Sequence, residues 1–600
     1  MTTLALVCDA GSSMDRRAVA DALEIRAITG STLEDVVSTA CDAIATGTYD
    51  RAAIVATGAS EPARERETVE EPLRAAGVDD VVWIDPRLAR SQSADDRSRL
   101  IAAATSAAAA VPDATDAEGL EPATDHVVVV DDPALARDVA TAFPVTHVAQ
   151  EPVGRRRRDV RTVRGRALEL VEGTDGSGLS VFVDGDGTSE RVAADQVVWP
   201  GYDGDLADRR DVHCGRAGVV GAVHRIARER TREPVAVDAA SCAVGRKGTD
   251  GCRACADVCP HDAVAISIDG DGSVAIDADA CTDCGACLGV CPTEAIESPR
   301  AAPLEALGEA TRAALETAST DGSRLPLVGS DPDPVVIAFT ARSVFPAVVA
   351  ASADGPPTVP IPVADASRVP ASLCCATIAA GAGGVAVVAD PREPAPGTVD
   401  EARRALEDLA DDAPVRRVAS TDPEAVAKTL RAVAREEPLV DDPDPIRAHA
   451  RTATAMAATA VDVLADGARQ DVRVPSLGTV SVDADACTLC QSCSRLCPTG
   501  ALAQPDTRTL TFDPAACVGC GICVACPEDA IDVDDVINVP LGDRSAVVES
   551  EGIVCENCGE PFASEAGFES VRETLEDADL PADIGLERCP SCRRAAGIAR

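Results

Sequence analysis

The sequence has few aromatic residues, almost no lysine and a large deficit of positive charge. Phe, Trp and Tyr make up 2% of its 600 residues, which argues against stacking platforms for nucleobases. It has 55 Lys and Arg against 100 Asp and Glu, so the formal net charge is −45. This excludes a protein that binds nucleic acid by neutralising phosphates. The only lysines are Lys247 and Lys428, and so acidic a surface predicts a halophilic protein, with an acidic face for a basic partner as the alternative.

Two kinds of apolar segment are also missing. The start, MTTLALVCDAG, has no basic stretch ahead of its apolar residues, so no signal peptide is expected. No run reaches 18 uninterrupted apolar residues, so no membrane span is expected. We therefore expect a cytoplasmic protein, and in such a chain the 25 cysteines are metal ligands before they are disulfides.

Short apolar runs alternate with alanine-rich helical stretches in the first 110 residues. Leu4–Asp9, Ala52–Thr57 and Val81–Asp85 read as strands, and Ser31–Ala45 reads as a helix. This rhythm predicts a parallel sheet. Further strands are expected at Val127–Val130, in a hairpin around Val181–Val192, and in the runs PVVIAF and GGVAVVAD of residues 334–390. A helix-like segment covers Ile446–Gly467.

Two cysteine runs have the spacing C-x2-C-x2-C-x3-C-P, at Cys281–Pro292 and Cys487–Pro498. Three thiolates at this spacing hold one iron–sulfur cube, and the fourth ligates the other cube of a pair. Each run therefore needs a partner. Cys242–Pro260 is the first partner, with nine residues after its first cysteine, and Cys517–Pro527 is the second, one residue short before its last cysteine.

The crossed pairing predicts four sets of thiols, each holding one 4Fe–4S cluster, with structural zinc as the alternative. The first set is Cys242, Cys252, Cys255 and Cys291, and the second is Cys281, Cys284, Cys287 and Cys259. The third set is Cys487, Cys490, Cys493 and Cys526, and the fourth is Cys517, Cys520, Cys523 and Cys497. Because of the insertion and the deletion, Cys242 and Cys526 are the least secure members.

These blocks resemble bacterial-type dicluster ferredoxins, a compact fold with the clusters in its core. The segments PHDAVAI, PTEAIE, PTGALA and PEDAID match the short helix and strand that this family places after each Cys-Pro. His261, directly after the first Cys-Pro, is either a surface residue or lies near a cluster and tunes its potential.

Cys555, Cys558, Cys589 and Cys592 form two knuckles about 30 residues apart in the sequence. Four thiolates in this arrangement suit a closed tetrahedral site. The pattern resembles a zinc ribbon and predicts one structural zinc. A further cluster, or a site that has lost its metal, is the alternative.

The segment YDRAAIVATGASEPARERETVEEPLRAAGVDDVVWIDPRLAR resembles the N-terminal domain of the flavin-binding, A-type subunit of heterodisulfide reductase. Cys8 and Cys41 lie near that family's N-terminal cysteines, without the fuller set. The resemblance implies a flavin fold next, but the loop after Val127–Val130 reads DDPALA in place of GxGxxG, and its Asp131 and Asp132 would repel a pyrophosphate. FAD binding is therefore not expected.

Residues 334–438 resemble the delta subunit of methyl-viologen-reducing hydrogenases, on the runs PVVIAF, GAGGVAVVAD and VRRVASTDPEAVAKTLRAV. That family's two-iron ligands fall on Thr340, Ala341, Ser343 and Asp390, so we expect the fold without the metal. The adjacent Cys374 and Cys375 are expected to be buried thiols. No role is assigned to Cys214 beside His213, and the run Arg155–Arg158 is either a solvated loop or a contact for an acidic partner.

The expected fold class is α/β, with degenerate Rossmann-like units, plus two α+β dicluster ferredoxin domains and a zinc ribbon. The expected boundaries are 1–115, 120–235 and 330–440 for the α/β regions, 236–300 and 475–540 for the ferredoxin domains, and 550–600 for the ribbon. The predicted function is electron transfer within a hydrogenase, heterodisulfide-reductase-like or molybdopterin oxidoreductase complex, with no catalytic pocket in this chain. The alternatives are a flavin-dependent component of a heterodisulfide-reductase-like enzyme and a maturation factor for a molybdenum enzyme.

Overall fold

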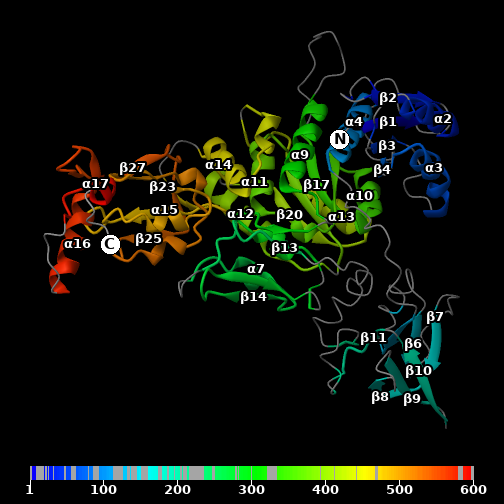
Figure 1. Cartoon of the computed structure of the whole chain (residues 1–600). Coiled ribbons are helices and arrows are strands. Elements are labelled where there is room, and N and C mark those ends of the chain that lie inside the picture. The colour runs from blue at the N-terminus through cyan, green and yellow to red at the C-terminus, as the bar shows by residue number, and fades with distance from the viewer. Residues whose placement is uncertain are drawn as a thin grey trace.

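The structure is a computed structural model of the whole chain (Figure 1). It describes residues 3–8, 19–20, 23, 26–30, 33–45, 49, 51–55, 63–78, 80–84, 94–111, 126–131, 136, 145–150, 160–172, 179–185, 188–194, 196–202, 204, 206, 212–214, 235–245, 250–277, 280–281, 283–298, 301–319, 334–391, 393–410, 412–440, 442–465, 470–578 and 585–595.

The N-terminal unit is a parallel sheet in the order β2-β1-β3-β4. Its strands are β1 (Thr3–Cys8), β2 (Arg26–Gly30), β3 (Arg51–Val55) and β4 (Asp80–Ile84), and its helices are α2 (Leu33–Ile44), α3 (Ala63–Ala75) and α4 (Ala94–Ala110). The predicted strands and the predicted helix at Ser31–Ala45 are confirmed to within two residues. Strand β2 was not predicted, because it is an edge strand whose Arg26 and Thr29 are exposed, so it lacks a continuous apolar run.

The strands between residues 127 and 213 stand apart from the other units (Figure 1). A parallel sheet in the order β12-β11-β5-β6-β7 contains β5 (Val127–Val130), β6 (Val145–Ala149), β7 (Val160–Arg164), β11 (Gln196–Val198) and β12 (Val212–His213). An antiparallel sheet contains β8 (Arg166–Glu172), β9 (Leu179–Gly185) and β10 (Thr188–Ala194), which confirms the predicted hairpin. The DDPALA loop is described only at Asp131 and Ala136, so the Rossmann-like interpretation of this region stays a prediction.

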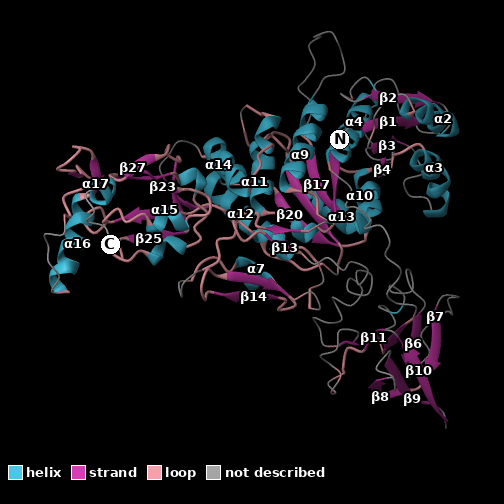
Figure 2. Cartoon of the chain, viewed as in Figure 1, coloured by secondary structure: helices cyan, strands magenta, loops and turns pink. Residues whose placement is uncertain are grey.

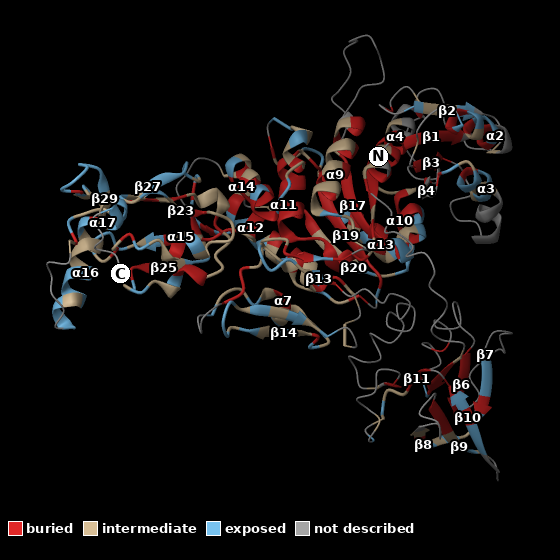
Figure 3. Ribbon diagram, viewed as in Figure 1, coloured by how far each residue is buried: buried red, intermediate tan, exposed pale blue. Residues whose placement is uncertain are grey.

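The central unit repeats the parallel order of the N-terminal sheet, as β18-β17-β19-β20. Its strands are β17 (Val336–Ala341), β18 (Thr358–Val363), β19 (Gly384–Ala389) and β20 (Val415–Ala419). Its helices are η2 (Arg342–Val344), α10 (Phe345–Ser352), η3 (Ala366–Arg368), α11 (Ala371–Ala379), α12 (Thr398–Ala410) and α13 (Pro423–Val433). Figure 2 shows these helices around the strands, and Figure 3 shows β17 and β19 as buried. Strands covered on both faces are continuous runs of Val, Ile and Ala.

The N-terminal and central units share one hydrophobic core, although the sequence places them far apart. Alanine-rich α4 packs against α9 (Leu304–Ser319), and Thr317 Oγ1 donates a hydrogen bond to Ser106 Oγ at 3.2 Å across this contact. The predicted helical segment at Ile446–Gly467 is divided into η4 (Pro445–Ala448) and α14 (Ala453–Leu464). Helix α14 packs against α11.

The two cysteine-rich blocks have the expected α+β character. The first contains β13 (Ala236–Val237), α7 (Ala254–Val258), β14 (Val264–Ser267), β15 (Ser273–Ile276), α8 (Ala286–Val290) and β16 (Ile296–Glu297). The second contains β21 (Gln470–Arg473), β22 (Thr479–Val482), α15 (Ser492–Leu496), β23 (Leu502–Asp506), β24 (Thr509–Phe512), η5 (Pro514–Ala516), η6 (Ile522–Ala525), β25 (Ile531–Asp534) and β26 (Val536–Val539). The prediction of a helix after each Cys-Pro is wrong, because a turn leads directly into the strand and the helical segments lie before the last cysteine of each run.

The C-terminal part continues with β27 (Ser545–Glu549), β28 (Ile553–Val554), β29 (Pro561–Ala563), α16 (Glu565–Asp577) and α17 (Pro590–Ala595). It contacts the second cysteine block, where Ser564 Oγ donates to the Thr488 carbonyl at 2.6 Å. Among the described helices, none combines the length and the apolar content that crossing a bilayer requires.

Candidate metal centres

The first set of thiols is gathered in one place in spite of the insertion after Cys242. Burial raises the pKa of Cys255 to about 12, and repulsion from the Cys252, Cys291 and Cys242 thiols adds to the rise. The insertion closes on itself, since the Cys252 N–H donates to the Ala243 carbonyl at 2.9 Å. Gly251 allows this approach, because a Cβ there would lie 2.6 Å from that same oxygen.

The four thiols of the second set and His261 line a single cavity, and the first residues of α8 also line it. Burial raises the pKa of Cys281, and the nearby thiols of Cys284 and Cys259 contribute to the rise. Backbone N–H groups point at two of these sulfurs, at 3.3 Å from Cys259 Sγ and 3.4 Å from Cys281 Sγ. His261 lies in the wall of this cavity, which favours the alternative in which it lies near a cluster over the one in which it is a surface residue.

The third set brings Cys526 to the run at residues 487–493. Burial raises the pKa of Cys487, with Cys526 and Cys490 among the charges that add to the rise. The shortened spacing before Cys526 has a structural explanation. The corresponding segment of the other run is the five-residue α15, whereas here the four-residue η6 is a 3₁₀ helix. Four residues at about 2.0 Å each span nearly the same distance as five at about 1.5 Å.

The fourth set also lines one cavity. Burial raises the pKa of Cys520 to about 11 and that of Cys523 to about 12, and the Cys497 thiol contributes to both. Cys497 comes from the other run of the block. In each of the four sets, the structure places the thiol from the other run near thiols of the first run.

The chemistry of these sets fits iron–sulfur clusters. Four thiols that lie close together and are mostly buried or half-buried cannot all ionise without a compensating positive charge, and iron supplies that charge when thiolates bind it. Backbone N–H groups directed at the sulfurs also favour the thiolate, as shown by their lowering effect on the pKa of Cys252, Cys493 and Cys517.

A separate site lies at the C-terminal end of the chain. The ligand atoms of Cys555, Cys558, Cys589 and Cys592 all lie within 4.8 Å of one another. Backbone N–H groups, that of Cys589 first at 3.2 Å, lower the pKa of Cys555 to about 6. Cysteine is ionised before it binds zinc, and the four thiols suit a tetrahedral zinc site.

Comparison with known proteins agrees with the two cysteine-rich blocks. Residues 250–295 match the family described as 4Fe-4S dicluster domain, and residues 480–503 match the one described as 4Fe-4S binding domain. These blocks are ferredoxin domains. They indicate an iron–sulfur electron-transfer protein. The matched segments leave out Cys242 and the run at residues 517–526, which the structure nevertheless brings into the sets.

One relative is the isethionate sulfite-lyase activating enzyme of Oleidesulfovibrio alaskensis (strain ATCC BAA-1058 / DSM 17464 / G20). It is 35% identical over 88 residues, which is 13% of this chain and 28% of the enzyme. The chain thus spans little more than a quarter of that relative, and the match does not bear on the predicted heterodisulfide reductase and hydrogenase resemblances.

The remaining predicted positions carry no cluster-like set in the described residues. Cys374 and Cys375 are fully buried in α11, as expected, and burial raises the pKa of Cys375 to about 12. Ser343 Oγ donates to Asp390 Oδ2 at 3.0 Å, so two of the four positions that the sequence analysis matched to two-iron ligands are joined by a hydrogen bond. Cys41 in α2 is half-buried. The side chains of Cys8 and His213, and the run 155–158, lie outside the described residues.

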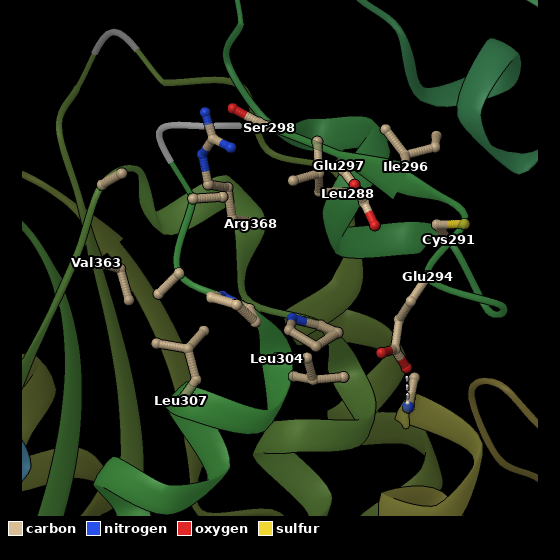
Figure 4. A pocket seen from close by; sticks show the side chains of 16 residues that line it. Leu288, Cys291, Glu294, Ile296, Glu297, Ser298, Leu304, Leu307, Val363 and Arg368 are labelled. Atoms are coloured by element: carbon tan, nitrogen blue, oxygen red, sulfur yellow. Dashed lines mark hydrogen bonds between the residues drawn. The ribbon is translucent and has the colours of Figure 1, made fainter. Parts of the chain in front are cut away.

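Sequence reasoning missed a cavity of about 380 Å³ between the first ferredoxin domain and the central unit. Figure 4 shows Cys291 and Glu294 at one end, where Glu294 accepts from the Ala453 N–H at 2.6 Å, and Arg368 beside Ser298 at another. Arg368 belongs to η3 and is 6% exposed. No sequence motif indicates its role, because its partner Asp283 is 85 residues away in the sequence.

Proposed function

We propose that this protein relays electrons through four 4Fe–4S clusters between a donor and an acceptor on partner subunits. The observation that carries the proposal is the crossed assembly of all four thiol sets. A bound cluster of this type exchanges one electron. The sequence resemblances favour partners of the hydrogenase, heterodisulfide-reductase-like or molybdopterin oxidoreductase type.

Contacts within each ferredoxin domain support short steps between paired sets. In the first domain, α7 packs against α8, and the Cys255 thiol is close enough to Cys287 to raise its pKa. In the second, α15 packs against η6, and Cys493 contributes to the raised pKa of Cys523. The first set is thus the neighbour of the second, and the third set is the neighbour of the fourth.

Helix α14 supports a connection between the two domains. At its N-terminus, Thr454 Oγ1 donates to the Pro292 carbonyl at 3.4 Å, directly after Cys291 of the first set. The same helix packs against η5, which directly precedes Cys517 of the fourth set. Cys520 is among the charges that raise the pKa of Cys252. We infer the order second, first, fourth, third set.

The two ends of this order differ in their surroundings. Cys490 of the third set is exposed, whereas the other fifteen thiols of the four sets are buried or half-buried. At the other end, the central unit covers the second set through η3. We therefore propose that the third set faces a redox partner. One structural zinc at residues 555–592 would stabilise the segment that contacts Thr488 beside this set.

Stepwise reduction of the anaerobically purified full chain tests the relay, with electrons counted by coulometry and centres counted by electron paramagnetic resonance (EPR). We expect the chain to take up about four electrons, one for each cube. Uptake of two or fewer would contradict the proposal. Flavin released by acid would favour the reductase alternative. A bound molybdenum enzyme whose maturation needs this chain, but not its reduction, would favour the accessory role.

A further inference from the structure

The carboxyl edge of the central sheet lies against the second thiol set. Residue Asp365 follows β18, and η3 begins directly after it. From η3, Ser367 Oγ donates a hydrogen bond to the Cys284 carbonyl. The Arg368 guanidinium donates from Nη2 to the Asp283 carbonyl at 2.8 Å and to Asp283 Oδ1 at 2.9 Å.

Arg368 is fixed in position by a second carboxylate. Its Nε donates to Asp365 Oδ2 at 3.2 Å, and the side chains of Arg368 and Asp365 are 5% and 3% exposed. The aliphatic part of Arg368 covers Gly285, where a Cβ would lie 2.2 Å from Arg368 Cγ. Gly285 also has φ of +77°, so the loop between Cys284 and Cys287 can hold this shape only with glycine.

One nitrogen of the guanidinium remains without a partner. Within the described part of the chain, Arg368 Nη1 is buried and makes no hydrogen bond. An unsatisfied buried donor of a charged group is costly, so negative charge nearby would stabilise this guanidinium. The guanidinium is also close enough to Cys287 for its charge to act on that thiol.

We propose that Arg368 is a positioning residue that raises the reduction potential of the second 4Fe–4S centre. Reduction adds one negative charge to the centre, and a buried positive charge beside it stabilises that state in a medium where charges are weakly screened. The guanidinium is held beside the second set by its hydrogen bonds to the carbonyl and the carboxylate of Asp283. This inference rests on the proposed function, because it requires a cluster in the second set.

Arg368 thus connects the central unit to the relay. Since the charge comes from η3 and not from the ferredoxin domain itself, the potential of the second centre depends on the docking of the two units. In an isolated ferredoxin domain the second centre would lack this guanidinium.

The test compares the potentials of all centres in the anaerobic full chain by EPR-monitored redox titration. Arg368→Gln removes the charge, and Arg368→Lys keeps it but removes the forked contacts. The control is Arg416→Gln, because Arg416 is a half-buried arginine of the central unit that donates to the carbonyls of Ala413 and Val415, away from η3 and the second set.

For Arg368→Gln we expect at least a tenfold shift of one redox equilibrium towards the oxidised centre, about 59 mV for a one-electron couple. Arg368→Lys should shift it less, and Arg416→Gln should leave all potentials unchanged. If iron and sulfide match the wild type and no potential falls, the inference is overturned while the relay stands. If the wild type lacks the second centre, the proposed function itself fails.

If Arg368→Gln fails to assemble the second centre, a second variant that keeps the guanidinium still tests the proposal. Asp365→Asn removes one of its two negative partners, so the field at the second centre becomes more positive and its potential should rise. An unchanged or lower potential in Asp365→Asn would contradict the proposal.

Discussion

Replacing Cys526 by serine tests the crossed pairing, because the two possible pairings predict the loss of different clusters. The structure places Cys526 beside Cys487 and Cys493, although it follows the run at residues 517–523 directly in the sequence. A serine hydroxyl is a poorer ligand for iron than a thiolate, so one cube should be lost or become incomplete. The expected loss is up to about four of about sixteen irons.

The assay is anaerobic alkylation of free thiols, followed by peptide mass spectrometry, on the variant and the wild type. In Cys526→Ser we expect modification of the rest of the third set, Cys487, Cys490 and Cys493, and protection of the fourth set. Cys497→Ser is the reciprocal variant and should expose Cys517, Cys520 and Cys523. Cys375→Ser, a buried cysteine outside every set, should leave the iron content unchanged. Exposure of the fourth set in Cys526→Ser would refute the crossed assignment.

Three further predictions concern the central contact, the C-terminal site and pH. Gly285→Ala should lower the free energy of unfolding by about 1–2 kcal/mol for the positive φ plus about 1–3 kcal/mol for the clash with Arg368, measured in urea. Gly270→Ala, where φ is +63° and nothing lies within 4 Å of the added Cβ, should lose the backbone part alone, and equal losses would contradict the contact. Cys555→Ser should remove one zinc without a change in iron, and a parallel loss of iron would indicate a further cluster at that site. Burial raises the pKa of Glu393 from 4.5 to about 7, so its contribution favours folding below pH 4.5 and is lost as the pH rises to about 7, by about 3 kcal/mol in all. Glu393→Gln should remove this slope from a plot of unfolding free energy against pH, and an unchanged slope would exclude Glu393 as its source.

The ferredoxin domains were predictable because cysteine spacing reports ligand geometry directly. The structure places the two irregular members, Cys242 and Cys526, near thiols of the first and third sets, and their role as cluster ligands stays a prediction. The short spacing at Cys526 could be understood only with the structure, since a 3₁₀ helix replaces an α-helix and nothing in the letters ICVA requires that choice.

Contacts between segments that are far apart in the sequence could not be predicted from it. Strand β2 was not predicted because an exposed edge strand has little apolar patterning. The shared core of α4 and α9 was not predicted because the sequence of an alanine-rich helix does not indicate which helix it packs against. Arg368 resembles any other arginine in a chain with many charges, and only the fold brings it to Asp283 and Gly285.

The most direct test of the central claim is the content of iron, zinc and acid-labile sulfide per chain, in protein purified without oxygen in high salt. The account predicts about sixteen iron, a similar amount of sulfide and one zinc. About eight iron would mean that only half of the thiol sets hold clusters and that the relay is shorter. Almost no iron with several zinc ions would contradict electron transfer and leave a zinc-stabilised scaffold.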